Sequence, residues 1–329
     1  MKKTNQSRNA TIDTLRFIGG FFVIFLHIHY NNHLEIVDHL RLMSRWAVPY
    51  YFIVSGYFFQ QNFLKDPLNN TFKNIIKIVS IYVVSSIIYI TINYIESKHF
   101  FSITSLFIGT YYHLWFLPSM IIGYIYIYTV NTFKINIYIQ YSIILIIIIT
   151  ILILDSYSGL FFGRILKVYS YSRLLISIPF MYLGFTIRKN QERIKNHLNK
   201  SVGFILLLIG YLIQMLEAKY LLENTHYPIA NHIFLIGTIF YTIAILILCV
   251  SFQSRDNVLS DYGRRYSLPI YLYHAIPLIF VNKFIISYKL SIAEIIILPL
   301  LIQVLMLIIL YFIDKYFNKL FNLINGTFK

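Results

Sequence analysis

Charged residues are scarce in this sequence, and acidic residues are the scarcest. Only 12% of the 329 residues are charged, with 13 Asp and Glu against 28 Lys and Arg, while 58% are hydrophobic. The mean hydropathy is +0.66. A soluble domain could not bury so much apolar surface, so the composition excludes that class and is typical of a protein that crosses a membrane several times. The basic excess then indicates which loops face the cytoplasm, and we expect no nucleic-acid partner.

Several signatures of other protein classes are missing. The single cysteine, Cys249, excludes an intrachain disulfide and a cysteine metal cluster, and we expect it to pack within its apolar run. Neither a glycine-rich phosphate loop nor a Gly-x-Ser-x-Gly elbow occurs, which disfavours an ATP-driven pump and a serine hydrolase. His27 and His29 point about 200° apart on a helix, so we do not expect them to share a metal ion. The first apolar run has no cleavage site after it, so we expect it to remain in the mature protein.

Long apolar runs dominate what is present. A membrane-spanning helix needs about 20 mostly apolar residues, and about ten such runs occur, so we predict an all-α polytopic bundle of about ten transmembrane helices. We expect a single domain over residues 1–329. The run from Tyr138 to Leu154 is unbroken and is expected to face lipid, whereas two others contain Pro and Gly and are expected to be packed or kinked. The runs are 13–33, 44–61, 73–95, 113–132, 137–155, 172–188, 201–221, 231–252, 267–287 and 291–314.

The basic residues predict the orientation in the membrane. If successive runs cross in alternate directions, most of the Lys and Arg residues fall on the side that holds the N-terminus. By the positive-inside rule this side is cytoplasmic. We therefore expect both termini in the cytoplasm and an even number of spans.

The first apolar run carries polar residues that suggest a functional site. Arg16 begins this run, and Asp13 precedes it by three positions, where the two can form an ion pair on a helix. His27 follows Arg16 by 11 positions, about 1100° of helical rotation, so the two share a face and are expected to open onto one internal chamber. His27 would lie near the middle of the hydrocarbon core. Such residues are costly inside a bilayer unless they face a protein interior or a wet cavity, although a hydrogen-bonded interior histidine is the alternative interpretation of His27.

Further polar residues lie in or at the ends of other runs and extend this site into a polar track across the membrane. They are Arg45, His113, Arg173, Glu217 and His274. Each also has a structural interpretation. Arginines at helix ends often extend to the interface, His113 with Trp115 fits an aromatic belt, and Glu217 fits an interfacial anchor.

Taken in order, these residues and their neighbours resemble the integral-membrane acyltransferase-3 family, the bacterial O-acyltransferases of cell-surface sugars. The resemblance covers residues 8 to about 275. It rests on Arg8-x4-Asp13-x-Leu15-Arg16, His27, Arg45-x3-Pro49, Ser55-Gly56, Tyr112-His113-Leu114-Trp115, Arg173-x5-Pro179 and Ser267-Leu268-x-Ile270-Tyr271-Leu272-x-His274. We expect no extracytoplasmic hydrolase-like domain of the kind that larger members carry, and no Arg-x-x-Arg is evident in the third run, so the roles of those elements are not carried over.

The resemblance implies a membrane O-acyltransferase in the bacterial cytoplasmic membrane. It would move an acetyl or other short acyl group from cytosolic acetyl-CoA, or another acyl-CoA, to a hydroxyl of a cell-surface or lipid-linked carbohydrate, and no metal is expected. His27 would act as general base, and Asp13 would fix the rotamer of Arg16. The donor phosphates would be held by cationic residues, namely Arg16, Lys73, Lys77, Arg188, Arg264 and Arg265. The acceptor side would be shaped by Arg45, His113, Arg173, Glu217 and His274.

Two other functions remain open from the sequence. The first is a non-enzymatic transporter or flippase for a lipid-linked sugar or nascent polysaccharide, because a polar track through a helical bundle suits that function too. The second is a structural partner in a complex that makes a surface polymer. An acyl-enzyme on His27 or Ser55, the acceptor sugar, the acyl length and a homo-oligomeric state are also left open.

Overall fold

The computed structural model describes residues 9–28, 35–96, 102, 104–164, 166, 169–194, 199–225, 228, 234–252, 254–285 and 290–326. Within these ranges every regular element is a helix, which confirms the predicted all-α class. Arg8 and His29 lie outside the described residues, so the first residue of the quoted motif and the His27/His29 pair are not placed.

Each predicted apolar run overlaps a helix or a pair of helices. These are α1 (Ala10–His27), α3 (Ala47–Phe63), α4 (Pro67–Ile95), α6 (Phe116–Thr132), α7 (Ile137–Leu154), α10 (Ser177–Lys189), α12 (Lys200–Thr225), α13 (Ile236–Ser251), α14 (Val258–Tyr273) with α15 (Ala275–Ile285), and α16 (Ile292–Tyr316). Shorter segments lie between or after them, namely α2 (Glu35–Ser44), α5 (Ser105–Ile108), α8 (Ser158–Phe162), α9 (Tyr169–Ser172), the 3-10 helix η1 (Arg173–Leu175), α11 (Gln191–Ile194) and α17 (Asn318–Ile324).

The protein is a polytopic helical membrane protein with fewer long spans than the sequence predicts. Among the described residues, 5 helices are long and apolar enough to cross a membrane, namely α1, α4, α7, α12 and α16. The number becomes 6 if α14 and α15, which meet at a bend of 50°, count as one broken span. The helix α10 has only 13 residues, so an apolar run in the sequence does not guarantee a helix of spanning length. The predicted positions of the helices are confirmed, whereas the count of ten spans stays a prediction.

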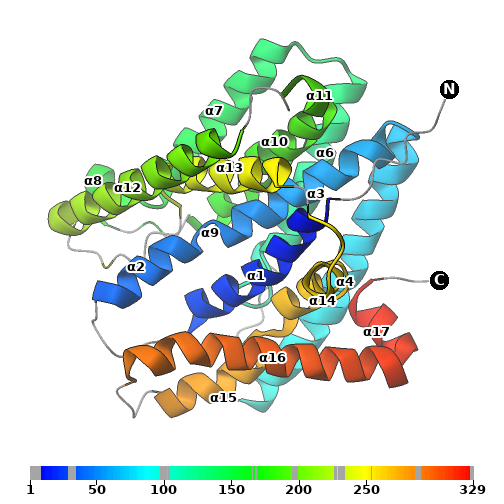
Figure 1. Ribbon diagram of the computed structural model, residues 1–329, viewed down its shortest axis with the longest axis vertical. Helices are drawn as coiled ribbons and strands as arrows, with labels where there is room; N and C mark the ends of the chain where they lie inside the picture. The colour runs from blue at the N-terminus through cyan, green and yellow to red at the C-terminus, as the bar shows by residue number, and fades with distance from the viewer. Residues whose placement is uncertain are drawn as a thin grey trace.

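Helix α1 lies at the centre of the molecule. Figure 1 shows it between α3 and α16, and it also packs against α13, α14 and α15. Its first turn is capped by Asn9, whose side chain accepts a hydrogen bond of 2.9 Å from the Thr11 backbone N–H. Helix α14 approaches it closely at Gly263, where an added Cβ would lie 1.8 Å from the carbonyl oxygen of Asp13. The residues of α1 are thereby surrounded by other helices.

Helices α3 and α10 cross at a similarly close contact. A Cβ on Gly56 would lie 1.9 Å from the carbonyl oxygen of Met181, and a Cβ on Gly184 would lie 1.9 Å from that of Ile53. Only glycine permits backbones to approach this closely, as at small-residue contacts between membrane helices. This finding confirms the prediction that the two runs containing Pro and Gly pack within the protein.

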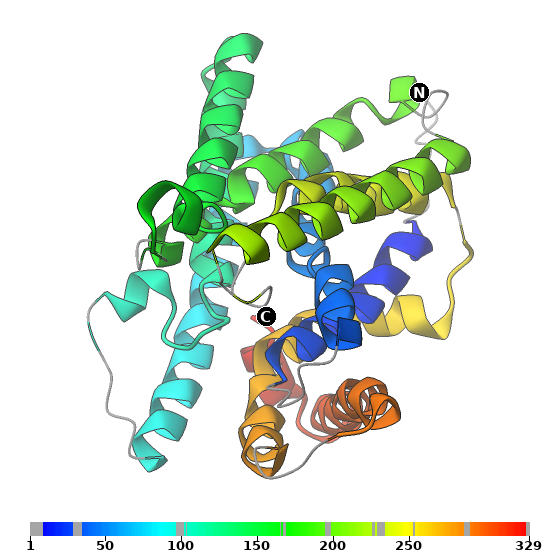
Figure 2. The same ribbon diagram turned by 90° about the vertical axis from the view of Figure 1, so that its left-hand side faces the viewer.

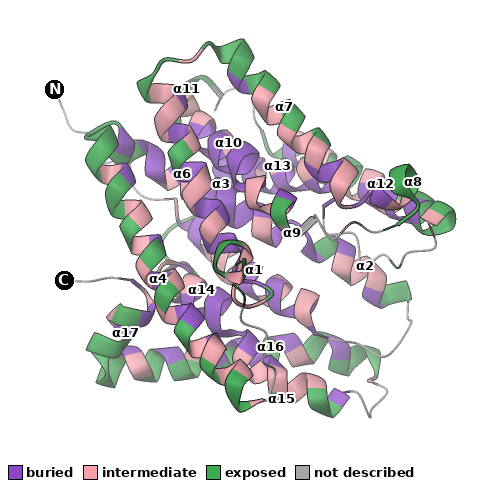
Figure 3. Ribbon diagram, turned by 180° about the vertical axis from the view of Figure 1, so that it is seen from behind, coloured by how far each residue is buried: buried purple, intermediate pink, exposed green. Residues whose placement is uncertain are grey.

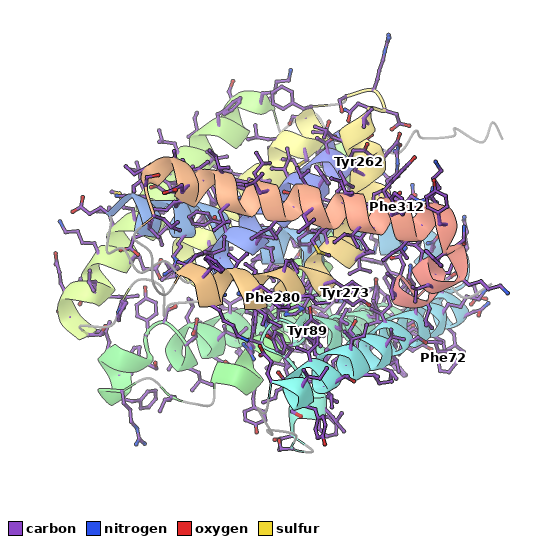
Figure 4. All side chains as sticks on the ribbon, turned by 90° about the horizontal axis from the view of Figure 1, so that it is seen from below. Phe72, Tyr89, Tyr262, Tyr273, Phe280 and Phe312 are labelled. Carbon is purple, nitrogen blue, oxygen red and sulfur yellow. The ribbon has the colours of Figure 1, made fainter. Side chains whose placement is uncertain are left out.

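The long helices α4, α7, α12 and α16 lie at the periphery and expose apolar side chains. In Figure 3 their outward faces are coloured as exposed, whereas buried residues gather on α1, α3, α10 and α13. Figure 2 shows α12 and α13 running side by side. Among the side chains labelled in Figure 4, Phe72, Phe280 and Phe312 are 62%, 68% and 57% exposed, while Tyr89 is fully buried. So much exposed apolar surface is stable against lipid and not against water.

Candidate active site

Arg16 and His27, both on α1, line two different cavities. The larger, the His27 cavity, has a volume of about 380 Å³ and is also lined by Arg45, Tyr112 and Arg173. The smaller, the Arg16 cavity, has a volume of about 240 Å³. The structure therefore separates the two residues that the sequence places on one face. The single chamber expected from the sequence is therefore divided into two cavities, which share the lining residue Tyr271.

Tyr271 of α14 forms part of the wall of both cavities. Its ring packs against those of Tyr51 and Phe116, with centroids 5.7 and 4.7 Å away. Its hydroxyl donates a hydrogen bond of 3.1 Å to the carbonyl oxygen of His113. Tyr271 is thus held by packing and by a hydrogen bond at the place where the two cavities come together.

The Arg16 cavity combines cationic and neutral polar groups. Besides Arg16 it is lined by Lys77, Ser55, Asn62 and Asn74. Nη1 of Arg16 lies 3.2 Å from Oδ1 of the buried Asp13, which confirms the ion pair predicted from their spacing. The other carboxylate oxygen of Asp13 lies 3.8 Å from Nη1 of Arg264. Asp13 therefore holds two guanidinium groups in place without reaching either cavity.

Three histidines gather behind and beside the His27 cavity. The rings of His27 and His274 stack with centroids 5.3 Å apart and an interplanar angle of 27°, and the ring of His113 lies 5.1 Å from that of His274. The ring centroid of Tyr112 lies 4.7 Å from that of His27. His113 and His274 are fully buried and do not line the cavity, so they support His27 and do not contact the cavity's contents.

The break between α14 and α15 fixes the protonation of the two supporting histidines. Nδ1 of His274 lies 2.7 Å from the carbonyl oxygen of Tyr271, and Nε2 of His113 lies 2.8 Å from that of Leu272. Because a carbonyl oxygen only accepts, each of these nitrogens carries the proton. The other ring nitrogens, Nε2 of His274 and Nδ1 of His113, are buried and have no hydrogen-bond partner among the described residues. Irregular backbone of this kind inside a membrane protein is tolerated where it is buried or lines a cavity.

Three arginines line the His27 cavity. Arg41 comes from α2 and donates a hydrogen bond of 3.2 Å to the carbonyl oxygen of Ile28. Arg45 lies in the turn before α3 and is only 7% exposed. Arg173 begins η1, and its guanidinium carbon lies 5.3 Å from the centroid of the Trp115 ring. The sequence predicts Arg45 and Arg173 at the acceptor side, and the structure brings both to the cavity with His27.

Glu217 lies elsewhere. Its carboxylate accepts hydrogen bonds of 2.9 and 3.1 Å from the backbone N–H groups of Ile236 and Gly237 and one of 2.8 Å from the hydroxyl of Tyr157. It therefore caps the N-terminus of α13, where a negative charge is favourable. Glu217 lines neither cavity, and its place at the acceptor side stays a prediction.

Most of the cations expected to hold the donor are bound within the protein or lie on the surface. Nη1 of Arg264 lies 2.8 Å from Oδ1 of Asp256, and Nη2 of Arg265 lies 2.7 Å from Oδ1 of Asp314. Arg188 donates a hydrogen bond of 2.8 Å to the hydroxyl of Tyr57. Lys73 is exposed. Of the six cations predicted for this role, only Arg16 and Lys77 line the Arg16 cavity.

The sequence alone does not indicate a role for two residues of the site. Arg41 is separated from Arg45 by one helical turn, and that spacing just before Pro49 is the signal that could have drawn attention to it. Tyr271 occurs within a quoted motif but receives no role, because nothing in the sequence shows that its ring lies between two cavities. Within the described part of the chain, no three His, Cys, Asp or Glu side chains are grouped to hold a metal ion.

One protein-family model covers most of the chain. The model of an acyltransferase domain matches residues 9–314. Two Enterococcus faecalis proteins, each named amino-acid racemase, are similar to part of the chain. One is 28% identical over 126 residues, which is 34% of this chain and 18% of the relative. The other is 29% identical over 134 residues, 36% of this chain and 18% of the relative. The chain thus matches less than a fifth of either relative's length, and no solved structure matches it significantly.

Proposed function

The chain belongs to the acyltransferase 3 family and is a membrane acyltransferase, and from that premise we propose its reaction. It transfers an acetyl or other short acyl group from an acyl-CoA to a hydroxyl of a cell-surface or lipid-linked carbohydrate. One observation carries this proposal. A single helix, α1, presents a cation to one cavity and an imidazole to another, and the two cavities share the ring of Tyr271.

The Arg16 cavity suits the donor. An acyl-CoA, when bound, supplies an activated thioester, and it carries phosphates and amides along its length. Arg16 and Lys77 provide the positive charge that phosphates need, and Asn62, Asn74 and Ser55 provide hydrogen-bonding groups for neutral polar atoms. The ion pair with Asp13 fixes the rotamer of Arg16, so its positive charge is already oriented before the donor binds.

His27 carries out the proton transfer. Its imidazole accepts the proton of the acceptor hydroxyl as the oxygen attacks the thioester carbonyl carbon. The carbon–sulfur bond then breaks, and the departing sulfur takes the proton from His27, which returns to its neutral form. His274 stacks on the ring and Tyr112 packs against it, so both hold the imidazole in orientation.

Thiol release from the purified protein tests this reaction. Acetyl-CoA is supplied with and without a surface-glycan extract, and free CoA is measured. We expect release only with acceptor, and we expect His27→Gln to lower kcat/KM by about 100-fold or more because general-base catalysis is lost. The matched control is His39→Gln. Nδ1 of His39 forms a hydrogen bond of 2.8 Å with the hydroxyl of Tyr211, and His39 lines neither cavity.

Two outcomes would contradict the proposal. Movement of the glycan across vesicles without thiol release would identify a transporter. Full acetylation of surface glycan in His27→Gln cells, combined with loss of the polymer when the whole protein is deleted, would identify a structural partner.

A further inference from the structure

The wall of the His27 cavity is strongly cationic. Arg41, Arg45 and Arg173 line it, and none of the described lining residues is Asp or Glu. A neutral sugar hydroxyl needs no such charge. Three guanidinium groups around one small cavity produce a positive potential inside it, which favours the binding of an anion.

Carboxylates lie near Arg45 but outside the cavity wall. The negative charges of Asp155, Asp38 and Glu217 stabilise the charged form of Arg45, whereas the positive charge of Arg41 destabilises it. Asp155 accepts a hydrogen bond of 2.8 Å from the backbone N–H of Phe234. Glu217 caps the N-terminus of α13. Neither carboxylate lines the cavity, so a ligand inside it meets the arginine side chains and not these acidic side chains.

The rest of the wall is largely apolar and aromatic. The side chains that supply this surface are Leu26, Val48, Tyr112, Trp115, Ile176 and Phe234. In such surroundings a hydrogen bond between a charged donor and an anion is stronger than in water. Guanidinium groups match the oxygens of phosphate in pairs, and a diphosphate or several phosphates of a phosphodiester chain carry more charge than a single carboxylate. The cavity therefore favours a phosphate group.

We propose that the acceptor is a sugar or polyol that carries a phosphate ester, bound by Arg41, Arg45 and Arg173 while a neighbouring hydroxyl reaches His27. This inference rests on the proposed acyl transfer and adds the chemical class of its acceptor. The phosphate comes either from a lipid-linked diphosphate or from a phosphodiester polymer.

Binding of inorganic pyrophosphate to the purified full-length protein tests the site without turnover. By calorimetry at low salt, we expect Arg45→Gln and Arg173→Gln each to weaken binding about tenfold or more, since each removes a charge-assisted pair of hydrogen bonds. Arg255→Gln is the matched control, because Arg255 is exposed on the segment before α14. Arg45→Lys, which keeps the charge and loses the planar fork, serves if Arg45→Gln does not fold.

Two results in this assay overturn the inference. One is pyrophosphate binding that Arg16→Gln abolishes and the Arg45 and Arg173 variants leave unchanged, which would place the phosphate site in the Arg16 cavity. The other is the absence of binding to the wild-type protein at low salt.

Turnover then separates this inference from the proposed reaction. With acetyl-CoA as donor, we expect a phosphorylated glycan to have a KM at least about tenfold below that of its neutral counterpart. We expect Arg45→Gln to remove this difference without changing the KM for acetyl-CoA.

Thiol release that is equal for both glycans overturns the inference and leaves acyl transfer standing. Pyrophosphate binding through Arg45 without thiol release from any acceptor overturns acyl transfer and leaves the phosphate site standing. Preference for a short polyprenyl-diphosphate sugar over a phosphodiester oligomer identifies the lipid-linked source, and the reverse preference identifies the polymer.

Discussion

Asp13 is the residue that links the first turn of α1 to both cations of its surroundings. Its carboxylate is fully buried and lies near Arg16 on its own helix and Arg264 on α14. A buried carboxylate that loses its charge leaves its partners without compensation. The side chain of Arg16 is 18% exposed, so part of that loss is screened by solvent.

We expect Asp13→Asn to raise the KM for acetyl-CoA more than it lowers kcat. The amide no longer fixes the rotamer of Arg16, so the donor is held less firmly, whereas His27 is unaffected. Steady-state kinetics of thiol release measure both values. Asp261→Asn is the control, because Asp261 is exposed and contacts only Arg264 among these cations. A fall in kcat with an unchanged KM would assign Asp13 to a different step.

Local spacing predicts contacts within one helix and fails between helices. The pair Asp13 and Arg16 follows from three positions on a helix, and it is confirmed. Arg16 and His27 share a helix as predicted, but they line separate cavities because Tyr271, far away in sequence, lies between them. The position of Glu217 could not be predicted either, since its partners are the backbone groups at the start of α13, which depend on how α12 and α13 pack.

At the scale of elements, glycines determine which helices come together most closely. Gly56 on α3 and Gly184 on α10 each face the backbone of the other helix. The pair α3 and α10 carries Pro49, which lines the His27 cavity, and lies next to Arg173. Separation of these helices would therefore widen the site as well as weaken the fold.

We expect Gly184→Ala to destabilise the protein by about 1–3 kcal/mol, because the added methyl group collides with the carbonyl of Ile53 and forces the backbones apart. Thermal unfolding in detergent, followed by light scattering or fluorescence, measures the change. Gly19→Ala is the control, since a Cβ there meets only the ring of Tyr51 at ordinary contact distances of 3.4 Å and more. Equal unfolding temperatures for the two variants would show that α3 and α10 adjust freely.

The hydrophobic pattern locates helices well and measures their length poorly. The run at 172–188 is interrupted before Ser177, where the chain forms α9 and η1, so only α10 continues as a regular helix. The run at 267–287 bends by 50° at His274, after Pro269 and before Pro277. Proline removes a backbone hydrogen-bond donor. Both runs contain proline, so each is interrupted although its sequence is mostly apolar.

At the scale of the whole molecule, the orientation in the membrane remains a prediction from the charges. We expect a reporter that is active only in the cytoplasm to function when fused after Lys329, and a periplasm-dependent reporter to fail there, because the positive-inside rule places the C-terminus inside. The same reporters fused after residue 96, at the end of α4, provide the comparison. Activity of the periplasm-dependent reporter at the C-terminus would contradict the proposed direction of donor entry.

The shared ring of Tyr271 has a consequence for the cell that contains this protein. If the Arg16 cavity opens to the cytoplasm and the His27 cavity to the outside, the ring of Tyr271, packed against Tyr51 and Phe116, lies between the two. An acyl group that passes between the cavities would need to displace the Tyr271 ring without letting a continuous chain of water molecules form across the membrane. The proton-motive force of the membrane would then survive each turnover, and a small residue at position 271 would turn the enzyme into a leak.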